Sequence, residues 1–313
     1  MHLVVNGKGR VRPLLAVSLL ALMMTAAACE GPAGPTGPAG SIGGIGGAGP
    51  TGPTGPAGTP GASVAGRTIF GLDGANGLIS FGAFTPDRII AKVTVTGLAA
   101  GETLIGIDFR PANDTLYAVS SASRVYTVNV TTGIATAVGS SAFTPALSGT
   151  SFGIGFNPVA DRLRIHSTTG QNLRVNQLTG AVAANDTALA YVAGDANFGA
   201  SPNIVATAYT NSVRPTPLAT DLYAIDSNRD ILVEVDRPNG GTLRTIGSLN
   251  FNTSEDAGFD IAGDTDIAYA SLTPSSAPGG PSRLYQINLR TGNATLLGAI
   301  NNASPLRSIA VAP

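Results

Sequence analysis

The sequence predicts an all-β protein: a five-bladed β-propeller closed by its C-terminal strand and preceded by a collagen-like Gly-X-Y stalk. Three observations lead to this prediction. After residue 63 the chain consists of short β-prone runs separated by Gly, Asn, Asp and Thr turns. These runs recur as a repeated unit. Before them, Gly occupies every third position from Gly31 to Gly61. The chain is thus expected to divide into residues 1–28, 29–63 and 64–313.

Residues 1–28 are expected to form a secretory signal peptide. Three basic residues are followed by an apolar stretch over residues 13–24, which is too short to span a bilayer. The small residues that then precede Cys29 resemble the lipobox of bacterial lipoproteins, in which the Cys is lipidated and becomes the new N-terminus. Cys29 is therefore the predicted lipidation site of an exported protein, anchored at the cell surface or outer membrane. Ordinary cleavage that leaves a free thiol is the alternative.

Residues 31–63 carry eleven uninterrupted Gly-X-Y triplets, many with Pro directly after Gly. A triple helix requires this period because only a hydrogen atom fits at its axis. The segment therefore predicts a homotrimer through residues 31–63. Pro is nearly absent from the third position, so an extended single-chain tether is the alternative. Either form would project the C-terminal domain by up to about 100 Å, at about 3.1 Å per residue.

Charge and cysteine content argue against several classes of function. Cleavage before Cys29 would remove three of the 18 Lys and Arg residues, leaving 15 against 19 Asp and Glu. Without a basic patch, nucleic acid is not an expected partner. The single Cys excludes an intrachain disulfide. Only one His would remain, His166, which we expect to be structural. No zinc site or Ser-His-Asp triad is therefore predicted.

The repeated unit is a strand, a turn that contains Gly, and a second strand. Its copies occupy residues 128–133, 175–180, 235–240 and 287–292. The predicted turn glycines are Gly133, Gly180, Gly240 and Gly292, which lie 47, 60 and 52 residues apart. Two further strands precede each copy, so that each unit holds four strands, as a propeller blade does.

The two ends of this region supply complementary parts of one further blade. Residues 308–313 resemble residues 106–111, a first strand, but nothing follows them. Residues 68–96 supply three strands that lack a first strand. Four whole blades and this shared one make five, and a closed ring has no long open sheet edge. A β-sandwich or an open β-solenoid of the same strands is the alternative.

Several runs of the sequence are similar to a bacterial family without known activity. Among them are LIGIDFRPANDTLYAVSS, VYTVNVTTGIATAVG, GFDIAGDTDIAYASL and LYQINLRTGNATLLG. In their residues and in their order along the chain, these runs resemble the family called domain of unknown function 4394, over roughly residues 70–313. The resemblance implies a repeat-built β domain of secreted proteins and implies no activity.

The candidate site residues come from the expected first strands of the blades. Alignment of these strands places Asp108 and Asp260 at matching positions, with Arg110 nearby. In a propeller they would face a common channel and would bind a ligand or an ion there. Two carboxyl groups about 5 to 10 Å apart would also suit glycoside hydrolysis. The ordinary role of such an Asp is to cap a turn or to bind backbone.

Two further features have simple explanations as turns. Asp256, Asp260, Asp264 and Asp266 form an acidic group that would hold Ca²⁺ through oxygen atoms, but their spacing matches no EF-hand loop. No cofactor is therefore part of the main hypothesis. The connection over residues 188–203 is expected to be the longest, and long loops on rigid scaffolds often carry binding sites. Its polar candidates are Asp195, Asn197 and Asn203.

Together these features predict an exported, lipid-anchored surface protein. Its propeller head, presented on the stalk, is expected to bind an extracellular protein or glycan without catalysis. Two alternatives remain at this stage. One is an exported, glycosidase-like hydrolase that uses the channel carboxylates, and the other is a structural component of the envelope with a passive head.

Overall fold

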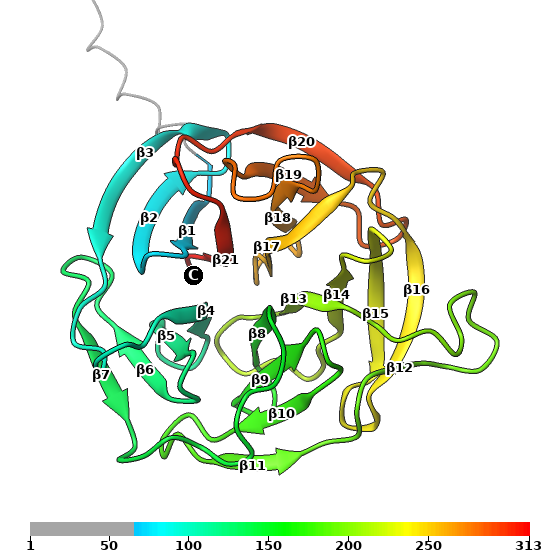
Figure 1. Ribbon diagram of the computed structural model, residues 1–313, viewed down its shortest axis with the longest axis horizontal. Coiled ribbons are helices and arrows are strands. Elements are labelled where there is room, and N and C mark those ends of the chain that lie inside the picture. Colours follow the sequence, from blue (N-terminus) through cyan, green and yellow to red (C-terminus); the bar gives the residue numbers. More distant parts are fainter. Residues whose placement is uncertain (1–65) are drawn as a thin grey trace, which may run out of the picture. The chain divides into compact units, whose positions relative to one another are not determined.

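The computed structural model describes residues 66–313, which form a ring of five sheets around a central axis (Figure 1). The predicted signal peptide, Cys29 and the Gly-X-Y segment lie outside the described residues. Each sheet is a blade, and the strand that comes first in its repeat lies nearest the axis. The prediction of a five-bladed β-propeller is confirmed, and the sandwich and the open solenoid are excluded. Within residues 66–313, no helix is long and apolar enough to cross a membrane.

The strands of each blade are given from the axis outward. Blade 1 contains β21 (Leu306–Val311), β1 (Thr68–Asp73), β2 (Gly77–Gly82) and β3 (Thr85–Thr94). Blade 2 contains β4 (Leu104–Arg110), β5 (Thr115–Ser120), β6 (Val125–Val128) and β7 (Ala135–Val138). Blade 3 contains β8 (Phe152–Asn157), β9 (Arg162–Ser167), β10 (Asn172–Val175) and β11 (Val182–Asn185).

Blade 4 has a fifth strand at its outer edge. It contains β13 (Ile204–Tyr209), β14 (Leu222–Asp226), β15 (Ile231–Arg237), β16 (Thr242–Ser248) and β12 (Ala190–Tyr191), which pairs parallel to β16. A short 3₁₀ helix, Pro238–Gly240, joins β15 to β16. Blade 5 contains β17 (Thr253–Ile261), β18 (Ala268–Pro274), β19 (Arg283–Ile287) and β20 (Ala294–Ala299).

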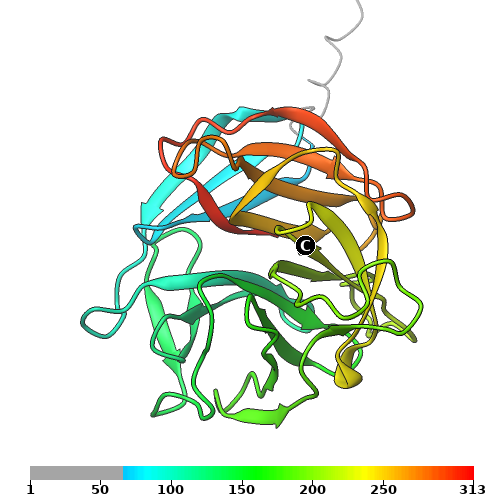
Figure 2. The ribbon, with the colours of Figure 1, turned by 45° about the vertical axis from the view of Figure 1, so that its right-hand side comes forward.

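The ring is closed by the last strand of the chain. β21 pairs antiparallel with β1, so that Phe70 lies opposite Ala310 and Gly71 opposite Ile309. In Figure 2 the red C-terminal strand accordingly lies beside the cyan N-terminal strands. The predicted closure by the C-terminal strand is confirmed. It leaves no gap in the ring at which an unpaired first blade would expose its edge.

The hydrophobic core lies between the blades rather than in one central mass. β5 shows why, because its successive side chains point to opposite faces of the sheet. Leu116 and Ala118 pack in the cluster shared with blade 1, whereas Tyr117 and Val119 pack in the cluster shared with blade 3. Both faces of such a strand are buried, which is why these segments are almost continuously apolar.

The repeated turn holds neighbouring blades together at their outer edges. Its glycine adopts a left-handed φ. A Cβ atom there would lie 2.5 Å or less from a backbone carbonyl oxygen of the preceding blade, or of the connection that follows that blade. This holds in four blades, at Gly133, Gly180, Gly241 and Gly292. Only glycine satisfies both requirements. The repeat read from the sequence therefore marks the contact between blades.

All four predicted glycines lie in their turns, but in blade 4 the close approach falls on the next residue. In blade 4 the turn is extended by the 3₁₀ helix Pro238–Gly240, so Gly240 ends that helix. Gly241 instead has the left-handed φ of 65° and approaches the carbonyl oxygens of Thr187 and Ala188. The repeated unit of blade 4, counted up to its left-handed glycine, is thus one residue longer than the other copies.

We expect Gly180→Ala to destabilise the fold by about 3 kcal/mol or more, because it adds a backbone collision to the strain of a left-handed φ. Gly101→Ala is the matched control. Gly101 has a φ of 81°, but nothing lies within 4 Å of an added Cβ. Its replacement is expected to cost only about 1 kcal/mol. Urea unfolding of both variants measures the difference, and equal losses would contradict the proposed contact.

Candidate functional site

The structure brings Asp108 and Asp260 together. They lie on the inner strands β4 and β17 and line one cavity of about 20 Å³ at the axis, together with Ser212 and Val311. A cavity of this volume has room for about one water molecule. The two acids therefore line one cavity, as the sequence predicted, but the space between them is very small, and ligand binding there stays a prediction.

Each of these carboxyl groups ties its own blade to the next one. The backbone N–H of Phe156, on β8, donates to Oδ2 of Asp108 at 2.6 Å. The N–H of Val311, on β21, donates to Oδ2 of Asp260 at 2.6 Å, and that of Ile261 donates to Oδ1 at 2.8 Å. The inner strands of neighbouring blades thus meet through a side chain rather than through a shared sheet.

Burial changes the acidity of both groups. Removal from water raises the pKa of Asp260 to about 7, even though two N–H donors favour its charged form. Burial also raises the pKa of Asp108 well above its usual range, and repulsion by Asp260 raises it further. The pair therefore holds protons at pH values where an exposed aspartate would be charged.

Arg110 does not line this cavity. Its guanidinium points to Asp161 in the β8–β9 turn, with Nε donating to Oδ1 at 2.8 Å and Nη2 donating to Oδ2. The hydrogen bond from Arg110 lowers the pKa of Asp161. Arg110 thus forms a further link between blades 2 and 3, as Asp108 does nearer the axis.

The connection between β13 and β14, residues 210–221, covers this end of the channel. Ser212 lines the small cavity, and an added Cβ at Gly263 of blade 5 would collide with the Ser212 carbonyl oxygen. Arg214 forms an ion pair with Asp114 in the β4–β5 turn of blade 2. A connection from blade 4 is thereby held on blades 2 and 5. Sequence analysis missed it, although Pro215 and Pro217 indicate a loop.

The polar residues of the connection over residues 188–203 have structural partners. Asp195 accepts hydrogen bonds from the N–H and the hydroxyl of Thr245 at 2.6 and 2.8 Å. Asn197 donates to the same hydroxyl. The side chain of Asn203 donates to Ser227 at 2.9 Å. These contacts fasten the connection to blade 4 and give no indication of a ligand.

The four aspartates considered for Ca²⁺ do not form one site. Asp256 lies near the start of β17, whereas Asp264 and Asp266 follow its end. Asp264 pairs with Arg67, and Asp266 accepts the N–H of Asn211. Between residues 66 and 313, no group of three or more His, Cys, Asp or Glu side chains is placed to hold a metal ion.

His166 is completely buried on β9. Burial, followed by the nearby charge of Arg164, lowers its pKa to about 3. The ring is therefore neutral at physiological pH and is not suited to exchange protons with solvent there.

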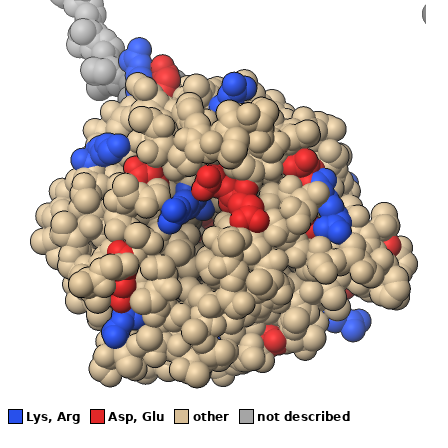
Figure 3. Space-filling view, viewed as in Figure 1, with Lys and Arg blue, Asp and Glu red and all other residues tan. Residues whose placement is uncertain are grey.

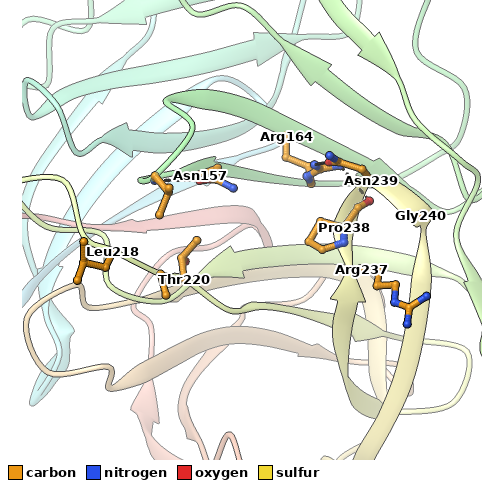
Figure 4. A pocket seen from close by; sticks show the side chains of 10 residues that line it. Asn157, Arg164, Leu218, Thr220, Arg237, Pro238, Asn239 and Gly240 are labelled. Carbon is orange, nitrogen blue, oxygen red and sulfur yellow. Dashed lines mark hydrogen bonds between the residues drawn. The ribbon is translucent and has the colours of Figure 1, made fainter.

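An open groove of about 470 Å³ lies between blades 3 and 4 (Figure 4). It is lined by Asn157, Val159, Arg164, Leu218, Ala219, Thr220, Arg237, Pro238, Asn239 and Gly240. They come from the end of β8 and the β8–β9 turn, from β9, from the β13–β14 connection, and from the end of β15 and the β15–β16 turn. The lining contains both polar and apolar side chains, and Leu218 is fully exposed.

Arg164 makes the floor of this groove rigid. Its side chain is only 2% exposed and donates to the Tyr209 hydroxyl at 2.7 Å and to Oδ1 of Asn239 at 2.7 Å. It also forms an ion pair with Asp186 at 3.1 Å. A buried guanidinium requires such a set of acceptors, and here they come from blades 3 and 4. Arg164 thus links blade 3 to blade 4 at the floor of the groove.

Comparison with known proteins identifies the family. The family model described as "Domain of unknown function (DUF4394)" matches residues 77–310, which is most of the chain. The chain belongs to this family. A search of the curated proteins found no match.

Several solved structures are similar to this DUF4394 member at low identity. A chain of the nidogen/laminin complex is 13% identical, covers 79% of this chain and 98% of its own, and has a TM-score of 0.43. A structural genomics protein of unknown function from Bacteroides thetaiotaomicron is 15% identical, with 78% and 61% covered and a TM-score of 0.43. The dihydro-heme d1 dehydrogenase NirN is 13% identical, with 76% and 44% covered and a TM-score of 0.37.

The buried acids are expected to make the stability of this DUF4394 protein depend on pH. Their pKa values are higher in the folded chain than the value of about 3.9 for an unfolded aspartate. Folding therefore binds protons, and this contribution to stability is complete below about pH 4 and is lost as the pH rises through about 7.

Asp108→Asn keeps a carbonyl oxygen for the Phe156 N–H and removes one buried acid. We expect the free energy of unfolding of the variant to exceed that of the wild type by about 1 kcal/mol or more at pH 8, and by less at pH 5. Urea unfolding at the two pH values measures this difference. Asp87→Asn, at an exposed position on β3, is the control and should change neither value. A variant that loses stability at pH 8 would show that the charged form of Asp108 is favourable.

Proposed function

We propose that this protein is an exported, lipid-anchored surface protein whose propeller head binds a glycan, without catalysis, in the groove between blades 3 and 4. The observation that carries the proposal is the difference in size between this groove and the cavity shared by the paired acids. The groove is open and about 470 Å³ in volume, whereas the paired acids lie in a cavity of about 20 Å³. This contrast supports ligand binding in the groove rather than catalysis at the acids.

The lining of the groove favours a carbohydrate. A sugar presents hydroxyl groups around its rim and C–H groups on its faces, so its site needs polar and apolar side chains side by side. Asn157, Asn239 and Thr220 supply amide and hydroxyl groups, while Val159 and Leu218 supply apolar surface. Because Arg164 already holds Asn239 in place, little side-chain entropy would be lost on binding.

The hydrolase alternative has less support. Glycoside hydrolysis requires two carboxyl groups that flank the scissile bond. Here both carboxyl groups accept backbone hydrogen bonds, and the cavity between them is far smaller than a sugar ring. A passive structural role in the envelope would not require a groove of this volume.

Anchoring and presentation rest on the N-terminal sequence. The basic start, the apolar stretch and the small residues before Cys29 support export and lipidation. The Gly-X-Y period over residues 31–63 supports a stalk, as a trimer or as a single extended chain. Projection from the membrane would suit a head that contacts an extracellular glycan.

Glycan binding is tested with the chain lacking residues 1–29 on a glycan array, followed by titration calorimetry with each glycan that binds. We expect Arg237→Ala and Leu218→Asp, which alter exposed groove residues, to weaken binding about fivefold or more. Arg290→Ala is the matched control, because Arg290 is exposed on the corresponding turn of blade 5. The proposal fails if no glycan binds, or if the groove variants bind as tightly as the control.

Lipidation has a separate test in a bacterial host fed with labelled palmitate. The wild-type chain is expected to incorporate label and to partition into detergent, and Cys29→Ser is expected to do neither. Because Cys29 is the only Cys of the chain, label on the protein has no other thiol to occupy. An unlabelled wild-type protein in the soluble fraction would instead indicate ordinary signal cleavage.

A further inference from the structure

A second cavity lies at the other end of the axis, where the inner strands begin. It measures about 230 Å³ and is lined by Ile105, Thr150, Ser151, Phe152, Glu255, Asp256 and Arg307. These residues come from blades 1, 2, 3 and 5 and from the connection that leads into β8. None of them lines the groove of the proposed function. Acidic and basic side chains gather at the centre of the face seen in Figure 3.

Glu255 is a fixed part of the wall. The hydroxyl of Thr150 donates to its Oε2 at 2.7 Å, and the amide of Asn203 donates to its Oε1 at 3.3 Å. The hydroxyl of Ser151 donates to its backbone oxygen at 2.9 Å. The Glu255 side chain is thereby held between blades 3, 4 and 5.

Asp256 and Arg307 line the same cavity but do not pair with each other. In the part of the chain from residue 66 onward, neither side chain forms an ion pair or a hydrogen bond. The Arg307 guanidinium lies over Gly74, where an added Cβ would be 3.0 Å from Nη2. It is nevertheless near enough to lower the pKa of Asp256, which burial raises by more. Two opposite charges thus face the cavity from separate positions.

We propose that this cavity binds a small zwitterion of the free amino acid class, with its ammonium group at Asp256 and its carboxylate at Arg307. Hydrogen bonds between charged groups are about twice as strong as neutral ones, and arginine matches a carboxylate with two parallel donors. The hydroxyls of Thr150 and Ser151 and the apolar side chains of Ile105 and Phe152 line the rest of the space.

The volume limits the size of the ligand. At about 30 Å³ per water molecule, the cavity holds the equivalent of seven or eight waters. Sites for drug-sized ligands begin at about 300 Å³. The cavity therefore suits a single amino acid and is too small for a peptide or an oligosaccharide.

The charges of the cavity argue against simpler ions. A divalent cation would meet the positive charge of Arg307, and both oxygens of Glu255 are already occupied by donors. A simple anion would meet the negative charges of Glu255 and Asp256. Only a ligand that carries both a positive and a negative charge can pair with Asp256 and Arg307 at once, because each of its charges then lies beside an opposite one.

The first test uses charge-deleted ligands on the unaltered protein, taken as the chain lacking residues 1–29. Titration calorimetry with the twenty common amino acids is expected to find at least one that binds. Its N-acetyl derivative lacks the ammonium charge and its amide lacks the carboxylate. Each derivative should bind about tenfold more weakly or worse. The absence of any binding, or equal binding of acid, amide and N-acetyl forms, would overturn the proposal.

The second test assigns the two charges to their residues through selectivity within each variant. Arg307→Gln should lose the preference for the acid over the amide, and Asp256→Asn should lose the preference for the free amine over the N-acetyl form. Arg244→Gln, which alters an exposed arginine paired with Asp236 on the outer strands, should keep both preferences. If both cavity variants retain the selectivity of the wild type, the ligand binds elsewhere and the assignment is wrong.

Discussion

The pairing of β21 with β1 is the constraint on which the rest of this molecule depends. It joins residues more than two hundred positions apart and converts five sheets into a ring. Closure also places Val311 against Asp260, and it places the hydroxyl of Ser308 beside the N–H of Ile107 at 3.1 Å. Without the last strand, blade 1 would expose an edge and the axial contacts on both sides of it would be lost.

Neighbouring blades are held by two kinds of contact at different distances from the axis. At the outside, a left-handed glycine such as Gly180 lets one backbone approach another, because no side chain intervenes. Near the axis, the buried carboxyl groups of Asp108 and Asp260 accept backbone N–H groups from the adjacent blade. The glycine contact requires the absence of a side chain, whereas the axial contact requires a buried acid whose pKa is then raised.

The two ends of the axis have different characters. At the end where the inner strands finish, the connection over residues 210–221 lies over the paired acids and leaves a cavity for about one water. At the other end, Glu255, Asp256 and Arg307 line a cavity of about 230 Å³ with charges of both signs. The same acidic strand, β17, contributes to both ends. One ring of strands thus provides a structural acid pair at one end and a candidate ligand site at the other.

The sequence by itself determined the blade count, the closure and the meeting of Asp108 with Asp260. Repeats, complementary chain ends and equivalent strand positions are all properties of order along the chain. Only the tertiary structure decided that Arg110 turns to Asp161, that Gly241 rather than Gly240 makes the close approach between blades, and that residues 210–221 cover the channel. It also decided that Asp256 and Arg307 share a cavity. Such contacts join residues on different blades, and their distances depend on how the whole ring packs rather than on any local pattern.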